Sequence, residues 1–402
     1  MNKNNLIILI GIAAIALVFV NSTYLSGQSF GGDKIISSNG DIEKSASMTE
    51  TNDKKNIIDK SQFKLAPEFD ESEGSTNIND YNQQPITMAD LKGKVVLVNF
   101  WTYSCINVLR TLPHLIDWDT KYADKGLVVV GVHTPEFKFE KDIDNVKSAI
   151  ERYGINYPII QDNDYKTWNA YENNYWPRMY LVDDEGYIRY DKVGEGDYNK
   201  TEKAIQSLLS ERNIKSGIEN NDQNSTYFHS NKPLHTSNNM SSFLTQSVDF
   251  SKIKTPELFF GYESPRPSLG NPEGFHPGQN ITYSTIPSNS SIKPNTIYLE
   301  GQWKNNPDNT EFQGDTDGRI ILNYTAKSVN LVAGGKGNGT VYVDGILVPT
   351  NSKGADIGND SKFVIDGPRL YNIVNHQSYN GSHLLEIDVK GKGFESFAFT
   401  FG

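Results

Sequence analysis

The chain has 402 residues, which is too long for one ordinary domain. Charged residues make up 22% and apolar residues 37%, which excludes a wholly disordered chain and a polytopic membrane protein. The formal net charge of −11 argues against a nucleic-acid-binding surface. Cys105 is the single cysteine, which excludes an internal disulfide and any metal site built from several cysteines.

The N-terminal region contains an uncharged run, LIILIGIAAIALVFV, over residues 6–20, preceded by Lys3. With the following NSTYL it reaches the length of a membrane span, about 20 residues. Because no small-residue cleavage signal follows, we predict that residues 1–25 form an uncleaved membrane anchor; the protein would be secreted if the segment were cleaved. The positive charge of Lys3 predicts that the domains lie outside the cytoplasmic membrane. Residues 26–62 are polar and are predicted to be a disordered linker.

The region 63–212 combines the periodicities of buried strands and amphipathic helices. A turn at Asp184-Glu185-Gly186 predicts that the last two strands form a hairpin. This order of elements predicts an α/β thioredoxin-like domain. The predicted elements are strands at 95–100 and 127–132, helices at 105–122 and 140–153, the hairpin strands at 178–183 and 187–193, and a closing helix at 200–211.

A second polar linker is predicted over 213–248, and a different residue pattern follows over 249–402. Short runs of β-forming residues are separated there by Gly, Asn, Asp and Pro, which predicts an antiparallel β-sandwich of jelly-roll character. The pair Asp344-Gly345 predicts a hairpin turn. The runs are TIYLEGQW, RIILNYTA, SVNLVAGG, GTVYVDGILVP, KFVIDG, LYNIV, HLLEIDVKG and FESFAFTFG.

Cys105 follows a predicted buried strand and stands at the first turn of a predicted helix. Backbone N–H groups at a helix start favour a thiolate and can lower the pKa of a cysteine. This position therefore predicts a nucleophile, and the alternative is a small buried side chain without chemistry.

The segment FWTYSC, with Asn99 before it and Pro113 after it, resembles the active-site segment of extracytoplasmic thioredoxin-like proteins. The strings GVHTPEF (131–137), YPIIQDNDYKTWNAYENNYWP (157–177) and YLVDDEGYIRYDKVGEGDY (180–198) resemble the DipZ family of cytochrome c biogenesis and thiol-disulfide interchange proteins. In that family a β-sandwich follows the thioredoxin-like domain, and TPELFFGY (255–262) and AFTFG (398–402) match its two ends. The resemblance covers residues 63–402. The bundle of membrane helices that the family often carries upstream is replaced here by one hydrophobic segment.

The second active-site cysteine of the family falls on Val108, so the motif reads Cys-Ile-Asn-Val. Valine cannot resolve a mixed disulfide, and Asn99 cannot accept a proton. The resemblance therefore implies a thiol-disulfide oxidoreductase whose single nucleophile is Cys105. Its substrates would be protein thiols and disulfides, an external reducing thiol would release the product, and it would support maturation of cytochrome c or of other proteins.

The resemblance also implies a substrate groove around the nucleophile. Pro177 matches the cis-proline of such folds, and a cis bond there leaves the backbone of Trp176 free to pair with an extended peptide. Aromatic residues near this point either rim the groove or belong to the core. The supporting residues expected are Trp101, Thr102, Asn107, Trp176, Pro177 and Arg178, and the further rings considered are Tyr103, Trp168 and Tyr175.

Two other functions stay open from the sequence. Thr102 and Cys105 form T-x-x-C, the centre of a peroxiredoxin signature, and Arg178 could hold peroxide beside a thiolate; Val98 stands where that signature has proline. A one-cysteine peroxidase is therefore one alternative. The other is a non-catalytic module that binds a client protein through the degenerate site and a glycan through the β-sandwich.

The sequence predicts neither a metal nor a cofactor. His114, His133 and Glu136 are candidate metal ligands near Cys105, but their spacing matches no compact ligand pattern. In the β-sandwich, a face carrying Trp303, Tyr342 and Asp344 could bind a sugar or calcium, although alternating aromatic residues are more often core or strand pairs.

Overall fold

The computed structural model describes residues 59–70, 78, 85–216, 242–286 and 292–402. The predicted anchor 1–25 and most of both predicted linkers lie outside the described residues. Within the described residues, no helix is both long enough and apolar enough to cross a membrane. The ends of the predicted linkers are structured: Lys60 forms an ion pair with Asp183 at 2.6 Å, and residues up to 216 continue the preceding helix.

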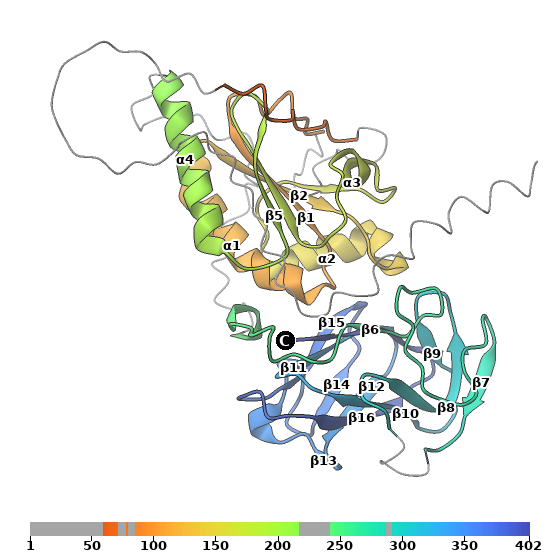
Figure 1. Ribbon diagram of the computed structural model, residues 1–402. Coiled ribbons are helices and arrows are strands. Elements are labelled where there is room, and N and C mark those ends of the chain that lie inside the picture. The colour runs from red at the N-terminus through yellow and green to blue at the C-terminus, as the bar shows by residue number, and fades with distance from the viewer. Residues whose placement is uncertain (1–58, 71–77, 79–84, 217–241, 287–291) are drawn as a thin grey trace, which may run out of the picture. The chain divides into compact units, whose positions relative to one another are not determined.

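A five-stranded sheet with the order β3-β2-β1-β4-β5 forms the centre of the first domain (Figure 1). β1 is parallel to β2 and antiparallel to β4, and β4 and β5 form the predicted hairpin. The strands are β1 (Val95–Trp101), β2 (Leu127–His133), β3 (Ile159–Gln161), β4 (Arg178–Val182) and β5 (Ile188–Val193). The helices are α1 (Ile106–Tyr122), α2 (Ile143–Tyr153), α3 (Lys166–Ala170) and α4 (Tyr198–Ser216), with short 3₁₀ turns η1 (Ala123–Lys125) and η2 (Lys138–Lys141).

Both faces of this sheet are covered, which explains why β1 and β2 are continuous apolar runs. Alternate residues of β1 point to opposite sides, so Val95 and Leu97 join the core that includes α1, whereas Val96 and Val98 join the core on the other face. The predicted thioredoxin-like α/β domain is confirmed. β3 and α3 were not predicted, because elements this short carry little periodicity.

The second domain is built from antiparallel pairings between its strands. The strand order is β13-β12-β16-β10-β8-β9-β17-β11-β15, with β14, β6 and β7 paired at its sides. All eight predicted β-type runs contribute strands. The strands are β6 (Leu258–Phe259), β7 (Asn280–Tyr283), β8 (Ile297–Asn305), β9 (Thr310–Phe312), β10 (Gly318–Tyr324), β11 (Ser328–Gly335), β12 (Asn338–Val343), β13 (Ile346–Leu347), β14 (Lys362–Val364), β15 (Arg369–Asn375), β16 (His383–Lys390) and β17 (Phe394–Phe401); the 3₁₀ turns are η3 (Ser242–Thr245) and η5 (Thr350–Ser352).

The halves of this β-rich domain are not the two separate sheets of the predicted jelly-roll sandwich. β8 pairs with β10 through residues 297–300 and with β7 and β9 through residues 301–305, so one strand serves both halves. The change occurs at Gly301, whose φ of 92° is unfavourable for other residues. The result is one continuous sheet folded around a large apolar core.

The hairpin turn predicted at Asp344-Gly345 is confirmed, since both residues have positive φ, at 54° and 80°. Of the face predicted to bind a sugar or calcium, Trp303 and Asp344 are already engaged within the domain. Trp303 is fully buried in the core, and the Asp344 carboxylate accepts hydrogen bonds from His383 Nδ1 at 2.8 Å and from the Leu384 amide at 2.9 Å. Burial of the tryptophan removes the ring that a sugar would stack on.

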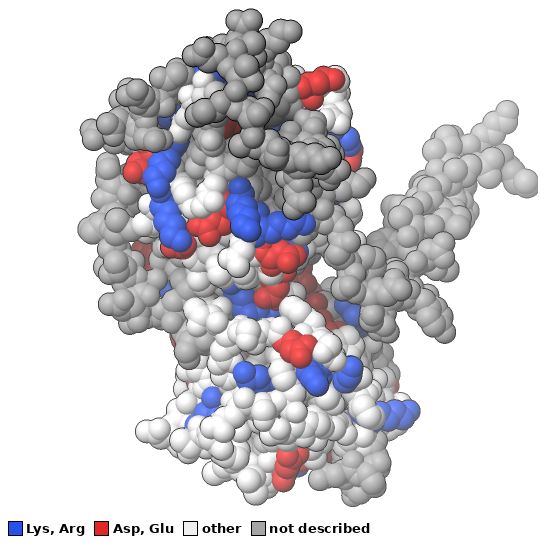
Figure 2. All heavy atoms as spheres, turned by 60° about the vertical axis from the view of Figure 1, so that its left-hand side comes forward, with Lys and Arg blue, Asp and Glu red and all other residues white. Residues whose placement is uncertain are grey.

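The two domains share a cluster of aromatic side chains. Phe137 and Phe139 of the first domain pack on Phe397 of the second, with ring centroids 5.5 and 4.7 Å apart, and Phe259 joins the same cluster. Burial of a phenylalanine side chain contributes about 1.5–3 kcal/mol. On the face shown in Figure 2, acidic and basic side chains are interspersed among uncharged residues.

Candidate active site

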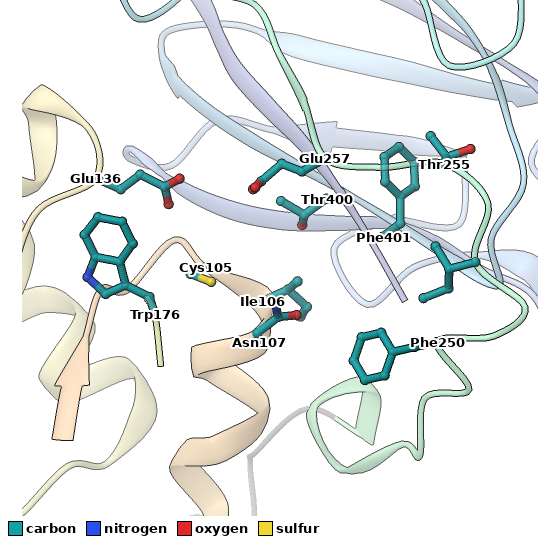
Figure 3. Close-up of a pocket in the computed structure, with 11 residues that line it drawn as sticks. Cys105, Ile106, Asn107, Glu136, Trp176, Phe250, Thr255, Glu257, Thr400 and Phe401 are labelled. Atoms are coloured by element: carbon teal, nitrogen blue, oxygen red, sulfur yellow. The ribbon is translucent and has the colours of Figure 1, made fainter. Parts of the chain in front are cut away.

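Cys105 lies in a pocket of about 210 Å³ that both domains line (Figure 3). The cysteine occupies the N-cap position of α1, between the end of β1 and the first helical turn. The first domain contributes Cys105, Ile106, Asn107, Glu136 and Trp176, and the second contributes Phe250, Ile253, Thr255, Glu257, Thr400 and Phe401.

The loop before Cys105 is held by the buried carboxylate of Glu140. Glu140 accepts hydrogen bonds from the hydroxyls of Thr102 and Ser104, the latter at 2.7 Å, and from the Ser104 amide at 3.3 Å. Its other oxygen accepts from the amides of Glu136 at 2.6 Å and Phe137 at 3.0 Å. One side chain therefore fixes both the nucleophile loop and the loop that carries Glu136. Burial raises the pKa of Glu140, and these hydrogen bonds act against that rise.

The sequence predicted a lowered pKa for Cys105, and the structure corrects this. Burial raises the pKa of the Cys105 thiol well above its ordinary value, and the charges of Glu136 and Glu257 raise it further. The amides of Asn107 and Val108 at the helix start lower the pKa, as predicted, but their effect is smaller. At neutral pH Cys105 is therefore a thiol, and its reaction as a nucleophile requires removal of a proton.

The carboxylates of Glu136 and Glu257 face one another across the pocket, with the Cys105 sulfur beside them (Figure 3). Burial raises the pKa of both carboxyl groups, and the charge of Glu257 makes ionisation of Glu136 still less favourable. For Glu257 the pKa rises to about 7, with Arg266 acting to lower it. The charge of Glu140 also raises the pKa of Glu136.

A second pocket of about 290 Å³ adjoins the first and shares Glu136 and Trp176 with it. Its remaining lining residues are Phe137, Phe259, Glu263, Ser264, Pro265, Pro307 and Asp308. Trp176 is half-buried between the two pockets, and its indole nitrogen donates to the Thr134 carbonyl at 3.1 Å. Trp176 is therefore a wall of the space around the nucleophile.

The peptide bond between Trp176 and Pro177 is cis, as predicted. Asn107 lines the Cys105 pocket, and its side-chain oxygen accepts a hydrogen bond from Arg110 at 2.8 Å. Val108 is fully buried among the side chains of the first domain's core. The position of the missing second cysteine therefore serves packing.

Most of the other aromatic side chains considered for the groove belong to the core. Trp101 is completely buried, with its ring edge-on to that of His133 at 5.2 Å. Tyr103 and Trp168 are also buried, whereas Tyr175 is 55% exposed. None of these four residues lines either pocket. Trp101 is the last residue of β1, and its ring packs into the apolar core on the α1 side of the sheet.

Thr102 and Arg178 are not arranged as the peroxidase alternative requires. The Thr102 hydroxyl is buried and donates to Glu140. Arg178 forms two hydrogen bonds with the Asp191 carboxylate, at 2.6 and 3.0 Å, and its guanidinium lies over the Tyr180 ring. Arg178 does not line the pocket of Cys105, so neither residue presents a free polar group to an oxidant at the sulfur.

The candidate metal ligands do not come together. His114 stacks on Tyr198 with ring centroids 3.6 Å apart, and burial lowers the pKa of His133 to about 3. In the described part of the chain, the one group of carboxylates with metal-like spacing is Asp183, Asp184 and Glu211. Cationic side chains already pair with this group, namely Lys60, Arg189 and Lys215.

Sequence reasoning missed Glu140 and Glu257. Glu136 and Glu257 each occupy the third position of a Thr-Pro-Glu string, at 134–136 and 255–257, and these strings were available as signals. Nothing in the sequence shows that the two strings meet at one cysteine. Glu140 carries no local signal, because its partners Thr102 and Ser104 lie in a different loop.

Comparison with known proteins agrees with this architecture. The AhpC/TSA family model matches residues 64–191, and the model described as a thioredoxin-like C-terminal domain matches residues 255–402. Protein DipZ of Mycobacterium bovis is 36% identical over 332 residues, which cover 81% of this chain and 41% of that protein. The chain therefore spans less than half the length of this relative.

Two relatives from Bacillus subtilis match the first domain. The thiol-disulfide oxidoreductase YkuV is 32% identical over 127 residues, which cover 31% of this chain and 85% of that protein. The thiol-disulfide oxidoreductase ResA is 31% identical over 121 residues, which cover 29% of this chain and 65% of that protein. The chain therefore belongs to the thioredoxin-like thiol-disulfide oxidoreductases and combines this domain with a C-terminal domain in the manner of DipZ.

Proposed function

We propose that the protein exchanges thiols and disulfides through Cys105 alone. The observation that carries this proposal is the position of Cys105, which is at the start of α1 in an open pocket beside the cis Trp176–Pro177 bond. The thiol-disulfide oxidoreductases among its relatives support the same chemistry.

The reaction has two steps of disulfide exchange. The Cys105 sulfur attacks one sulfur of a client disulfide, the client S–S bond breaks, and a mixed disulfide forms between Cys105 and the client. The other client sulfur leaves and is protonated. An external thiol then attacks the client sulfur of this mixed disulfide, the S–S bond to Cys105 breaks, and Cys105 leaves and is protonated while the client carries the new disulfide.

The external thiol is required because Val108 stands where a second thiol would resolve the mixed disulfide. Val108 is fully buried in an intact core, so the site is well packed without that thiol. Cys105 thus acts as a monothiol site, and the direction of exchange depends on the thiols supplied to it.

We further propose that residues 1–25 anchor the protein and that the two domains act outside the cytoplasmic membrane. The uncharged run at 6–20 supports the anchor, and the resemblance to DipZ supports a role in maturing proteins there, cytochrome c among them. Digestion of intact cells with an external protease tests this location. Domains that remain protected until the cells are opened would contradict it.

The test of the exchange activity uses the full chain and an oxidised model peptide containing one disulfide. Intact mass measurement should detect a mixed disulfide on the wild type and none on Cys105→Ser. A small external thiol should then release the peptide. In Val108→Cys, release should proceed without the external thiol, because the second sulfur lies one helical turn away.

The same experiment compares the reaction of Cys105 with hydrogen peroxide and its reaction with the peptide disulfide. A wild type that forms no mixed disulfide at any pH contradicts the proposed exchange. If peroxide instead oxidises Cys105 to a sulfenic acid faster than the peptide disulfide reacts, the one-cysteine peroxidase replaces it. If Cys105 is inert to both reagents, the site is a binding module without redox chemistry.

A further inference from the structure

We propose that Glu257, a residue of the C-terminal domain, is the acid–base group for the reaction of Cys105. This inference rests on the proposed thiol-disulfide exchange and adds the group that moves its proton. Glu257 would take the proton of the thiol as the sulfur attacks and would return it to the sulfur that leaves. The C-terminal domain would then complete the active site of the first domain.

The residues before and after Glu257 are both anchored to the sheet of the second domain. Before it, the Thr255 hydroxyl accepts a hydrogen bond from the Thr325 amide at 2.7 Å. After it, Leu258 and Phe259 form β6, which pairs with Phe399 and Ala398 of β17. The side chain extends from this anchored segment toward the Cys105 sulfur (Figure 3). Its position is therefore fixed by the sheet of the second domain.

The first domain offers few other bases for this proton. Asn99 cannot accept a proton, and His133 is buried beneath the loop without lining the pocket. The carboxylate of Glu140 is engaged by five hydrogen-bond donors of two loops. Among the described residues that line the pocket of Cys105, the remaining groups that can accept a proton from the thiol near neutral pH are Glu136 and Glu257.

The charges around the pair favour Glu257 as the acceptor. Burial raises the pKa of both carboxyl groups, which favours a state in which the pair shares one proton. Glu136 faces two carboxyl groups, Glu140 and Glu257, whereas Arg266 stabilises the ionised form of Glu257. Glu136 therefore retains the shared proton and Glu257 is the ionised partner.

The step balances without any further reactant. The proton of Cys105 moves to the Glu257 carboxylate while the thiol sulfur forms a bond to the client sulfur. The electron pair of the client S–S bond goes to the leaving sulfur, which takes the proton from Glu257. The Glu257 carboxylate is regenerated. One disulfide is broken and one is formed, so no external oxidant or reductant is needed for this step.

The experiment compares the full-length wild type with Glu257→Gln in the rate of mixed-disulfide formation, from about pH 5 to about pH 9. General acid–base catalysis predicts a loss of roughly tenfold or more near pH 7, which shrinks at alkaline pH as the thiol ionises without help. A purely electrostatic role predicts the opposite sign. Removing a negative charge would lower the pKa of Cys105 and make Glu257→Gln react faster.

Three controls make the result specific. Glu311→Gln removes a carboxylate from β9 of the same domain, outside the pocket, and should react like the wild type. Glu257→Asp keeps a carboxylate and should recover part of the rate. Glu136→Gln places a neutral side chain where the protonated Glu136 stood, so its loss of rate should be smaller than that of Glu257→Gln.

The failures of the two proposals are distinguishable. If the wild type forms no mixed disulfide, the exchange activity itself is absent. If the wild type reacts and a folded Glu257→Gln reacts equally fast or faster, Glu257 is not the acid–base group. Should Glu257→Gln not fold, the pH dependence of the wild-type rate decides. If the rate shows no rise near pH 7, where Glu257 ionises, and increases only at alkaline pH, where the Cys105 thiol itself ionises, the assignment is overturned.

Discussion

The two walls of the Cys105 pocket are built in different ways. The wall from the first domain is fixed by a buried carboxylate, Glu140, whose oxygens satisfy donors in two loops. The wall from the second domain brings a carboxylate, Glu257, that faces the pocket, and this wall is attached through the aromatic contacts of Phe397. The first wall determines where the sulfur lies, and carboxylates from both walls, Glu136 and Glu257, make its ionisation less favourable.

The difference shows that a carboxylate near a cysteine can serve structure or chemistry according to its partners. Five donors keep Glu140 occupied, so a substitution there should act on folding. Glu257 and Glu136 meet each other and the thiol, so substitutions there should act on protonation. The following experiments test this division.

The largest effect on stability is expected from Glu140→Ala. Its removal leaves the hydroxyls of Thr102 and Ser104 and three backbone amides without their acceptor, which should lower the free energy of unfolding by about 3 kcal/mol. Urea unfolding measures this loss. Glu172→Gln is the control, because its pair with Lys64 is exposed and should contribute less than about 1 kcal/mol. Equal effects of both substitutions would show that Glu140 does not organise the loops.

The next effect concerns the attachment of the second wall. Phe397→Ala removes a buried ring that packs on Phe137 and Phe139 and should cost about 3 kcal/mol. Alkylation of Cys105 should also become faster, since the second domain no longer closes the pocket as firmly. Val364→Ala, on the exposed strand β14, is the control and should change neither quantity. An unchanged alkylation rate in Phe397→Ala would contradict the role of this contact.

The smallest effect is a difference in pH dependence. The pKa of Glu257 is about 7 in the folded protein and near its ordinary value of 4.5 when unfolded, so the folded state keeps a proton that the unfolded state has lost. The stabilisation by this proton is complete below about pH 4.5 and is lost as the pH rises through 7. The glutamine of Glu257→Gln does not ionise, so the variant does not lose stability as this proton dissociates. The melting temperature of the wild type should therefore fall relative to that of the variant between about pH 5 and about pH 8.

The comparison with the variant is essential to this measurement, because His133 and His376 act in the opposite direction. Burial lowers their pKa values to about 3 and about 4, so both histidines add stability as the pH rises toward 6.5. These contributions are the same in both proteins and cancel in the difference. A pH-independent difference between the melting temperatures would show that Glu257 ionises as freely in the folded state as in the unfolded one.

The sequence predicted most elements of the first domain because its strands and helices have strong periodicity. β1 and β2 are covered on both faces and therefore read as continuous apolar runs, and α1 begins directly after Cys105 as expected. The second domain was predicted as strands, but the passage of β8 between both halves was not. That path depends on the conformation of Gly301 and on partners far away in the sequence.

The sequence by itself determined that Cys105 is the one thiol of the chain and that position 108 is valine, and from these identities it predicted the nucleophile and the need for an external thiol. Only the tertiary structure decided the protonation of Cys105. The pKa of a thiol depends on burial and on charges within a few ångströms, and here Glu257 is brought to the sulfur from a segment about 150 residues away along the chain. Tertiary contacts also engage three other expected site residues: Thr102 donates to Glu140, Trp101 is buried against His133, and Arg178 pairs with Asp191.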